Sequence, residues 1–292
     1  SEMLPTAIAA GSDLFLFFND PDEDFKWMME GYKNGIITDE RLEEALTRIL
    51  GTKAALGLHK KAKTEILPEK EVAMAKIGLE ENKAIAKEVS DKAITLVKNT
   101  QDILPIAPEK TKRVLLVEAK GFDGGFGKFI EIMGGAKKKP IEIVKELLEA
   151  KGFEVEIWES PIDKIMKLPK EEMAQALGNV YAGKRPIAEL TSKYDLIINI
   201  ANVNASVDQR LQWPPSKGTP DIPFYVNEIP TIFVSVKCPF HLADVPQVKT
   251  YINTYDDNQQ TLEALVEKLV GDTEFKGISP VDAFCGFGDT RF

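Results

Sequence analysis

The sequence predicts an α/β fold in which a mostly parallel sheet carries helices on both faces. Short apolar runs alternate with longer amphipathic segments, so strands alternate with helices along the chain. Two of these runs, residues 195–201 (DLIINIA) and 231–236 (TIFVSV), lack polar alternation, which is typical of strands buried on both faces. The length of 292 residues and the apolar fraction of 43% are sufficient for one large or two ordinary domains with a substantial core.

The first elements follow from local signals. A helix is expected over residues 4–10, and residues 13–18 (DLFLFF) form a continuous apolar run that predicts a strand buried on both faces. Asp20 is placed to cap the next helix, with Pro21 at its first position and Gly35 at its end. Thr38 is placed to cap the helix after that, which Gly57 ends.

The remaining elements alternate regularly. A linker over residues 60–68 precedes a long amphipathic helix at 68–90, and the domain boundary is expected near residues 60–69. Strands are expected at 94–97, 113–118, 153–158, 195–201, 231–236 and 251–255, and helices at 140–148, 170–181, 186–194 and 258–270.

The beginning of the chain poses a problem of pairing. A strand at 13–18 that is buried on both faces needs neighbours on both sides, and no strand precedes it. The chain also opens on Ser1, part-way into an expected helix. A removed tag or a processed terminus would explain this, but a strand without neighbours favours a cut inside a larger fold. Residues 1–58 are therefore expected to be disordered, rearranged, or packed on another chain or copy.

Four motifs in order carry a resemblance to a known family. Residues 7–18 (AIAAGSDLFLFF) and 35–58 (GIITDERLEEALTRILGTKAALGL) come first, and residues 91–106 (DKAITLVKNTQDILPI) follow. Near the end stands Gly271-x3-Phe275-x-Gly277-x2-Pro280. Together they resemble glycoside hydrolase family 3, and among its members the β-N-acetylhexosaminidases that have a second domain.

The resemblance implies an architecture and a function. Residues 1–62 would be the last strand, exit helix and linker of a truncated (β/α)8 barrel, and residues 63–292 a flavodoxin-like α/β sandwich domain. The intact protein would be a retaining glycosidase that removes terminal β-linked sugars, N-acetylglucosamine in the closest subgroup. The family's aspartate nucleophile and the subgroup's histidine acid/base would both lie outside this chain, which is therefore expected to be inactive alone.

Several residues of this chain are candidates to replace those groups. Ile37-Thr38-Asp39 is similar to the family's nucleophile motif, but it opens a helix, where capping and the helix dipole explain both polar residues. Asp13 stands at the beginning of a strand, whereas barrel sites lie at the carboxyl ends. Asn19 and Asp20 follow the strand, so Asn19 is a candidate to face a sugar, although capping explains Asp20. Neither histidine, His59 nor His241, is expected to have the carboxylate that would orient a catalytic imidazole.

The loop over residues 202–218 is the second candidate for a sugar-facing surface. It follows the strand at 195–201 and contains Asn202, Asn204, Arg210 and Trp213, which together can hydrogen-bond and stack a sugar. In the β-glucosidase branch of the family, the second domain supplies a glutamate near such a strand end. No glutamate stands here, so a surface loop held by Trp213 is the alternative.

Two further kinds of site were considered. The glycine-rich residues 121–127 follow a strand, and Glu159 ends the next one, as in dinucleotide-binding folds. Their spacing is not G-x-G-x-x-G and the next helix begins too far away, so no cofactor is predicted. Cys238 and Cys285 show no metal-ligand spacing, so no metal is predicted either. They are buried thiols or one disulfide, and thiols are the default.

Charge and hydropathy limit the partners. The net charge is −9 and the only basic run is residues 137–139, so nucleic acid is not an expected partner. No apolar stretch reaches the roughly 20 residues that a membrane helix needs. The expected partners are a carbohydrate substrate and, for residues 1–58, a barrel domain or a second copy. The compartment is undetermined, and a non-catalytic α/β module that binds carbohydrate or protein is the alternative function.

Overall fold

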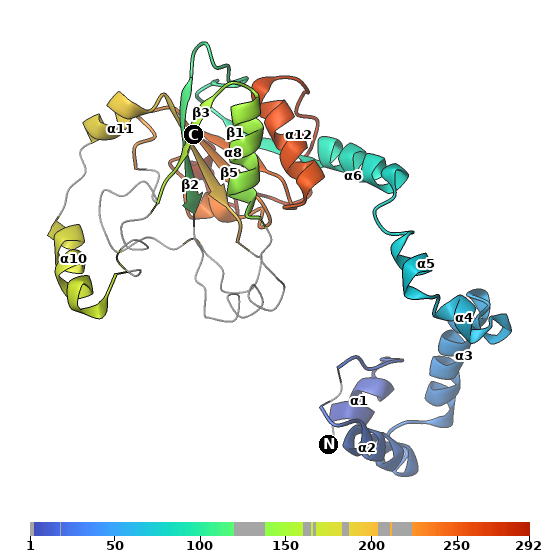
Figure 1. Ribbon diagram of the computed structural model, residues 1–292. Helices are drawn as coiled ribbons and strands as arrows, with labels where there is room; N and C mark the ends of the chain where they lie inside the picture. Colours follow the sequence, from blue (N-terminus) through green and yellow to red (C-terminus); the bar gives the residue numbers. More distant parts are fainter. Residues whose placement is uncertain are drawn as a thin grey trace. The chain divides into compact units, whose positions relative to one another are not determined.

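A computed structural model describes residues 3–17, 19–119, 138–159, 165, 168–182, 187–203, 211 and 224–292, with the backbone alone for 177–182. The chain divides into two compact units, Ser1–Leu79 (unit 1) and Glu80–Phe292 (unit 2). Figure 1 shows helices alone in the described part of unit 1 and a sheet with helices in unit 2.

Unit 1 consists of helices joined by short irregular segments. They are α1 (Met3–Ala9), α2 (Pro21–Lys33), α3 (Asp39–Ala55), η1 (Leu58–Lys60), α4 (Lys63–Ile66) and α5 (Lys70–Met74). The predicted caps are confirmed, because the Asp20 side chain accepts hydrogen bonds from two backbone N–H groups of α2 and Thr38 accepts one from Arg41. The helix starts of this unit therefore follow from local sequence.

The strand predicted at residues 13–18 is wrong for residues 13–17, which the structure shows as irregular. Leu14, Leu16 and Phe17 are 68%, 79% and 98% exposed. A strand needs a hydrogen-bonded neighbour, and the described part of unit 1 contains no other strand to provide one. Residues 13–17 therefore stay irregular, and whether another chain or copy covers them stays a prediction.

The single helix predicted at residues 68–90 is also wrong. Two helices occupy this stretch, α5 and α6 (Glu80–Ala93), and Gly78 separates them with a φ of 71°. This left-handed conformation is easily adopted by glycine and ends a run of right-handed helix. The apolar periodicity of the sequence continues through the break, so periodicity alone did not reveal it.

Unit 2 contains the predicted mostly parallel sheet, and this fold class is confirmed. After α6 come β1 (Thr95–Asn99), β2 (Arg113–Ala119), α8 (Pro140–Ala150), β3 (Glu154–Ile157), α10 (Lys170–Ala182), α11 (Ile187–Lys193), β4 (Leu196–Ala201), β5 (Thr231–Ser235), η2 (His241–Ala243), β6 (Thr250–Asn253), α12 (Gln259–Val270) and η3 (Gly288–Arg291). The strand order is β1-β6-β5-β4-β2-β3. Among the strand pairs of the described residues, β1–β6 is the antiparallel one and the other four are parallel.

The two faces of the sheet are both buried. Ile198 and Ile200 of β4 belong to the large apolar cluster that includes residues of α8 and α12, two helices that lie side by side over the sheet in Figure 1. Ile197 points to the other face, where it packs with Leu190 of α11 and Tyr225. This arrangement explains why β4 and β5 have no polar alternation, as expected for parallel strands covered on both sides.

The closing motif of the resemblance has a physical role in unit 2. Gly271 ends α12 with a φ of 84°, and the chain then returns past the beginning of β1. A Cβ atom at Gly277 would lie 2.4 Å from the carbonyl oxygen of Ala93 and 2.5 Å from that of Ile94. Glycine is therefore required at position 277 for this close approach of two backbones.

Candidate functional site

The carboxyl ends of β4, β5 and β6 lie together at one edge of the sheet, here called the carboxyl edge. Ala201, Ser235 and Asn253, the last residues of these strands, pair in register across the sheet. Ligands of open α/β sheets bind outside this edge. The residues that follow these strands are therefore the candidate site of unit 2.

Of the four candidates predicted in the loop at 202–218, the structure describes one. Asn202 follows β4 directly and is half-buried, and its side-chain oxygen is buried without a hydrogen-bond partner among the described residues. Asn204, Arg210 and Trp213 lie outside the described residues. The structure thus places Asn202 at the carboxyl edge and leaves the sugar-facing role of all four as a prediction.

Val203 and Leu211, the two buried residues of this loop that the structure describes, fix it to the rest of unit 2. Val203 and Leu211 pack in one apolar cluster with Leu242. The backbone N–H of Leu211 donates to the Asp244 carboxylate over 3.2 Å, so the segment after η2 holds the loop as well. Sequence analysis missed this role of Asp244, because a carboxylate that binds a distant backbone group has no sequence signature.

A serine and a histidine lie together at the carboxyl edge, which sequence analysis also missed. Ser235 Oγ is 2.8 Å from His241 Nδ1 and 2.5 Å from the carbonyl oxygen of Cys238, and both side chains are 1% exposed. A carbonyl only accepts, so the single hydroxyl hydrogen of Ser235 goes to Cys238. His241 Nδ1 must then donate to Ser235.

That direction of donation decides what the pair can do. A general base must accept the hydrogen of the nucleophilic hydroxyl. His241 instead donates to Ser235, and burial keeps both away from solvent. The pair therefore supports the loop after β5 and does not form a nucleophile with its base.

Other polar side chains at the carboxyl edge have the same supporting role. Asn253 Nδ2 donates to the carbonyl oxygen of Pro239 over 3.2 Å, and Thr254 Oγ1 donates to that of Val236 over 3.1 Å. Burial raises the pKa of the Tyr251 phenol, which keeps it neutral. These contacts fix the loop at residues 236–241.

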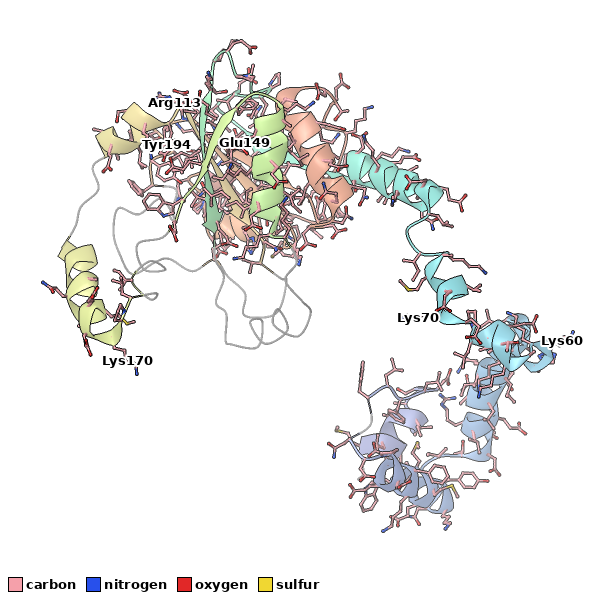
Figure 2. The ribbon with its side chains drawn as sticks, in the orientation of Figure 1. Lys60, Lys70, Arg113, Glu149, Lys170 and Tyr194 are labelled. Carbon is pink, nitrogen blue, oxygen red and sulfur yellow. The ribbon has the colours of Figure 1, made fainter. Side chains whose placement is uncertain are left out.

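A pocket opens at the opposite, amino edge of the sheet. Its lining includes Arg113, Glu156, Lys193 and Tyr194, and Figure 2 shows Arg113 and Tyr194 close together beside α11. Arg113 pairs with Asp195 over 2.6 Å, and Lys193 pairs with Glu156 over 2.8 Å. The hydrogen bond from Arg113 lowers the pKa of Asp195, and burial raises that of Tyr194. The pocket's charged groups thus largely neutralise one another.

In unit 1, the residues weighed as catalytic replacements have structural roles. Asp20 caps α2, and Asp39 accepts a hydrogen bond from Tyr32 Oη over 2.6 Å. Asn19 is exposed. The capping interpretation of Asp20 and Thr38 is therefore correct, and the sugar-facing role of Asn19 stays a prediction.

Asp13 has a partner that sequence analysis did not identify. Arg41 Nη2 lies 2.5 Å from Asp13 Oδ1, and Arg48 Nη1 lies 3.2 Å from it. Arg41 also donates through Nε to the carbonyl oxygen of Ile8 over 2.8 Å. The hydrogen bond from Arg41 lowers the pKa of Asp13. Asp13 thus joins the irregular segment to α3, as the structural interpretation of this residue requires.

The remaining candidate residues do not assemble a site. Cys238 and Cys285 are thiols, as the default predicted. Among the described residues, no group of three histidine, cysteine, aspartate or glutamate side chains has the arrangement of a metal site. The described helices also include none that is long and apolar enough to cross a membrane. The glycine-rich residues 121–127 lie outside the described residues, and Glu159 is exposed.

Comparison with known proteins finds similarity along the whole chain to proteins whose names refer to glycosides. A β-N-acetylglucosaminidase/β-glucosidase of Cellulomonas fimi is 37% identical over 295 residues, covering 100% of this chain and 47% of that protein. The solved structure of a β-glucoside phosphorylase is 38% identical with a TM-score of 0.73, covering 99% of this chain and 47% of the other. The chain matches no protein-family model.

A third comparison bears on the fold alone. The structure of a glycoside hydrolase family 3 β-N-acetylglucosaminidase from Paenibacillus sp. has 19% identity and a TM-score of 0.60, covering 95% of this chain and 46% of that one. The chain spans about half the length of each of these relatives. Together the comparisons confirm, along the whole chain, its resemblance to glycoside hydrolase family 3.

Proposed function

We propose that this chain is one part of a retaining glycosidase that removes terminal β-linked sugars, N-acetylglucosamine in particular. The observation that carries the proposal is the 37% identity with the Cellulomonas fimi β-N-acetylglucosaminidase/β-glucosidase, which extends over the entire chain. An identity that runs through both units argues against a binding module joined to an unrelated sequence.

The nucleophile and the acid/base are proposed to lie in the half of the relatives' length that this chain does not span. Retention of configuration needs two such groups about 5 Å apart on either side of the sugar. Among the described residues, Asp13, Asp20 and Asp39 are engaged in structural hydrogen bonds. The Ser235–His241 pair is buried and holds the loop after β5, which supports a nucleophile and an acid/base outside this chain.

The part played by unit 1 is likewise a proposal. Residues 1–62 are proposed to be the last strand and helices of a barrel, and residues 63–292 to be the second domain. The exposed Leu14, Leu16 and Phe17 support this, because a barrel sheet or a second copy would cover them. Asn19 would then face the sugar from the barrel, and Asn202, Asn204, Arg210 and Trp213 from the second domain.

A specific observation favours a second candidate, phosphorolysis. The solved structure with 38% identity is that of a β-glucoside phosphorylase. In that reaction inorganic phosphate, in place of water, accepts the sugar from the enzyme. The non-catalytic binding module is the third candidate, and it predicts sugar binding by this chain without turnover by the longer protein.

The test compares this chain with the longer protein that contains it. Both are incubated with an aryl N-acetyl-β-glucosaminide and an aryl β-glucoside, with and without inorganic phosphate. Hydrolysis by the longer protein alone supports the proposal, and a sugar 1-phosphate identifies the phosphorylase. In the longer protein, Trp213→Ala is expected to raise KM for longer substrates.

A control addresses the capping assignments directly. Turnover by this chain alone that disappears in Asp39→Asn would relocate the active site into unit 1. The same loss in both Asp39→Asn and Thr38→Ala, which removes the cap but no carboxylate, would instead indicate that α3 had unfolded.

A further inference from the structure

The two cysteines of this chain lie in neighbouring loops of unit 2. Cys238 follows β5 by three residues, and Cys285 lies in a turn near the end of the chain. The sulfur of Cys285 is 4.0 Å from the carbonyl oxygen of Phe240, which is only two residues after Cys238. The turn that contains one of the two cysteines of the sequence thus contacts the loop that contains the other.

Both loops are held in place by independent contacts. In the turn, the Asp282 carboxylate accepts hydrogen bonds from the backbone N–H groups of Phe284 and Gly286 over 3.1 and 2.8 Å. The loop after β5 is fixed by Ser235, which donates to the carbonyl oxygen of Cys238, and by Asn253, which donates to that of Pro239. Their proximity is therefore a feature of the folded unit.

We propose that Cys238 and Cys285 form a reversible disulfide, so that this pair of loops responds to thiol–disulfide balance. The oxidant is a small disulfide such as oxidised glutathione. A thiolate of the protein attacks the small disulfide, forms a mixed disulfide and releases one glutathione. The second protein thiolate then attacks the mixed disulfide and releases the other glutathione. Two protein thiols are oxidised, one glutathione disulfide is reduced, and the two protons pass to the departing thiolates.

The difference in burial sets the order of these steps. Cys285 is half-buried, whereas Cys238 is 7% exposed. A small disulfide reaches the more accessible thiol first, because exchange requires access to the attacking sulfur. Cys238 then closes the bond from the protein interior, where the carbonyl of its neighbour Phe240 already contacts the sulfur of Cys285.

The disulfide would join the irregular segment after α12 to a loop that directly follows a strand of the sheet. The segment after α12 has no strand and ends in η3, and it is fixed by the buried Ala283 and by Phe284, which packs in the same apolar cluster as Leu242. The other loop follows β5 at the carboxyl edge. Closing the ring restricts the unfolded chain, so the oxidised form is expected to be more stable than the reduced one.

The experiment treats the full chain with oxidised and reduced glutathione at several ratios, followed by alkylation and intact-mass measurement. Oxidation is expected to remove about 2 Da, and a protease digest should contain a peptide in which Cys238 is joined to Cys285. The melting temperature should rise by about 5 °C, and dithiothreitol should reverse both changes.

Cys285→Ser is the matched control, because position 285 is half-buried and this variant keeps the buried Cys238. It should keep the reduced melting temperature at every glutathione ratio. A wild-type chain that keeps two alkylatable thiols, stops at the mixed disulfide, or links two copies would overturn the proposal. Bond formation requires the two Cα atoms to come within about 7 Å, and the digest tests that requirement directly.

Discussion

Unit 1 and unit 2 obey the same sequence rules but differ in what covers their apolar residues. In unit 2, the apolar side chains of β2, β4 and β5 are fully buried between the two layers that flank the sheet. In unit 1, large apolar side chains such as Leu16 and Phe17 are 79% and 98% exposed. Local signals shape helices in both units, but only unit 2 has its own core.

The difference follows from where hydrogen bonds and burial come from. A helix satisfies its backbone within itself, so a cap and a few favourable residues are enough to define it. A strand needs partners that lie far away in sequence. Unit 2 contains six strands that supply each other with partners, whereas residues 13–17 find none within the described part of unit 1.

The largest expected difference is in the cooperativity of unfolding of the two parts of the chain when each is made alone. A chain of residues 68–292 should be soluble and unfold in one cooperative transition, because it contains the whole sheet and its flanking helices. Residues 1–67 alone should unfold without a cooperative transition, since they bury almost no apolar residues. Chemical denaturation followed by circular dichroism distinguishes the two. An aggregated or molten product from residues 68–292 would contradict the assigned boundary.

A matched pair of leucines compares the units at one side chain each. Leu116 in β2 is fully buried, and Leu16 in unit 1 is 79% exposed. Leu116→Ala should lower the free energy of unfolding of this chain by about 2–5 kcal/mol, because it leaves a cavity in the core. Leu16→Ala should change it by less than about 0.5 kcal/mol. Urea denaturation of both variants checks the comparison.

The same pair has a second use in the longer protein. If a barrel sheet covers Leu16 there, Leu16→Ala should become as costly in that protein as Leu116→Ala. An equally small effect in both proteins would show that the residue stays exposed and that unit 1 is no part of a barrel.

Most elements of unit 2 were predictable, and the misses have physical causes. Continuous runs such as residues 195–201 and 231–236 identified β4 and β5, because burial on both faces removes the alternation of polar and apolar residues. The helix break at Gly78 was missed, because a single glycine within a helical pattern of apolar residues is usually tolerated inside a helix. Residues 13–17 were misassigned because a continuous apolar run predicts a buried strand, and the described part of unit 1 contains no strand with which it could pair.

The candidate site was less predictable than the fold. Capping by Asp20 and Thr38 depends on neighbours in sequence and was correct. The roles of Asp244, His241 and Arg41 depend on contacts across 33, 6 and 28 positions, and side-chain pairs of this kind have no sequence period. Sequence analysis identifies which residues have suitable chemistry, but the fold decides their partners.

A polar seam between α6 and α12 gives the next prediction. Lys87 pairs with Glu267 over 3.0 Å, Ser90 and Thr261 share a buried hydrogen bond of 2.8 Å, and Asp91 pairs with Lys268 over 2.7 Å. The apolar Ile85 and Val89 of α6 are instead about 60% exposed. The helix that begins unit 2 is therefore attached through polar contacts.

Within this seam, Asp91 should matter more than Lys87. The side chain of Lys268 is 0% exposed, so Asp91→Asn leaves a buried ammonium without its counter-charge and should cost about 1–3 kcal/mol of unfolding free energy. The side chain of Lys87 is 52% exposed, and Lys87→Met should cost about 1 kcal/mol or less. Equal losses in the two variants would contradict the importance of burial.

The smallest expected effect is a pH dependence of the same pair. The hydrogen bond from Lys268 lowers the pKa of Asp91 in the folded protein below the unfolded value of about 3.9. The stabilisation is therefore fully present above about pH 4 and is lost as pH falls through the folded pKa, because the unfolded state then binds more protons. Asp91→Asn removes this titrating group. The difference in unfolding free energy between the wild-type chain and Asp91→Asn, measured by urea denaturation from about pH 6 down to pH 3, should be constant above about pH 4 and shrink below it. A difference that stays constant over the whole range would show that Asp91 keeps its unfolded pKa and gains no electrostatic stabilisation from Lys268.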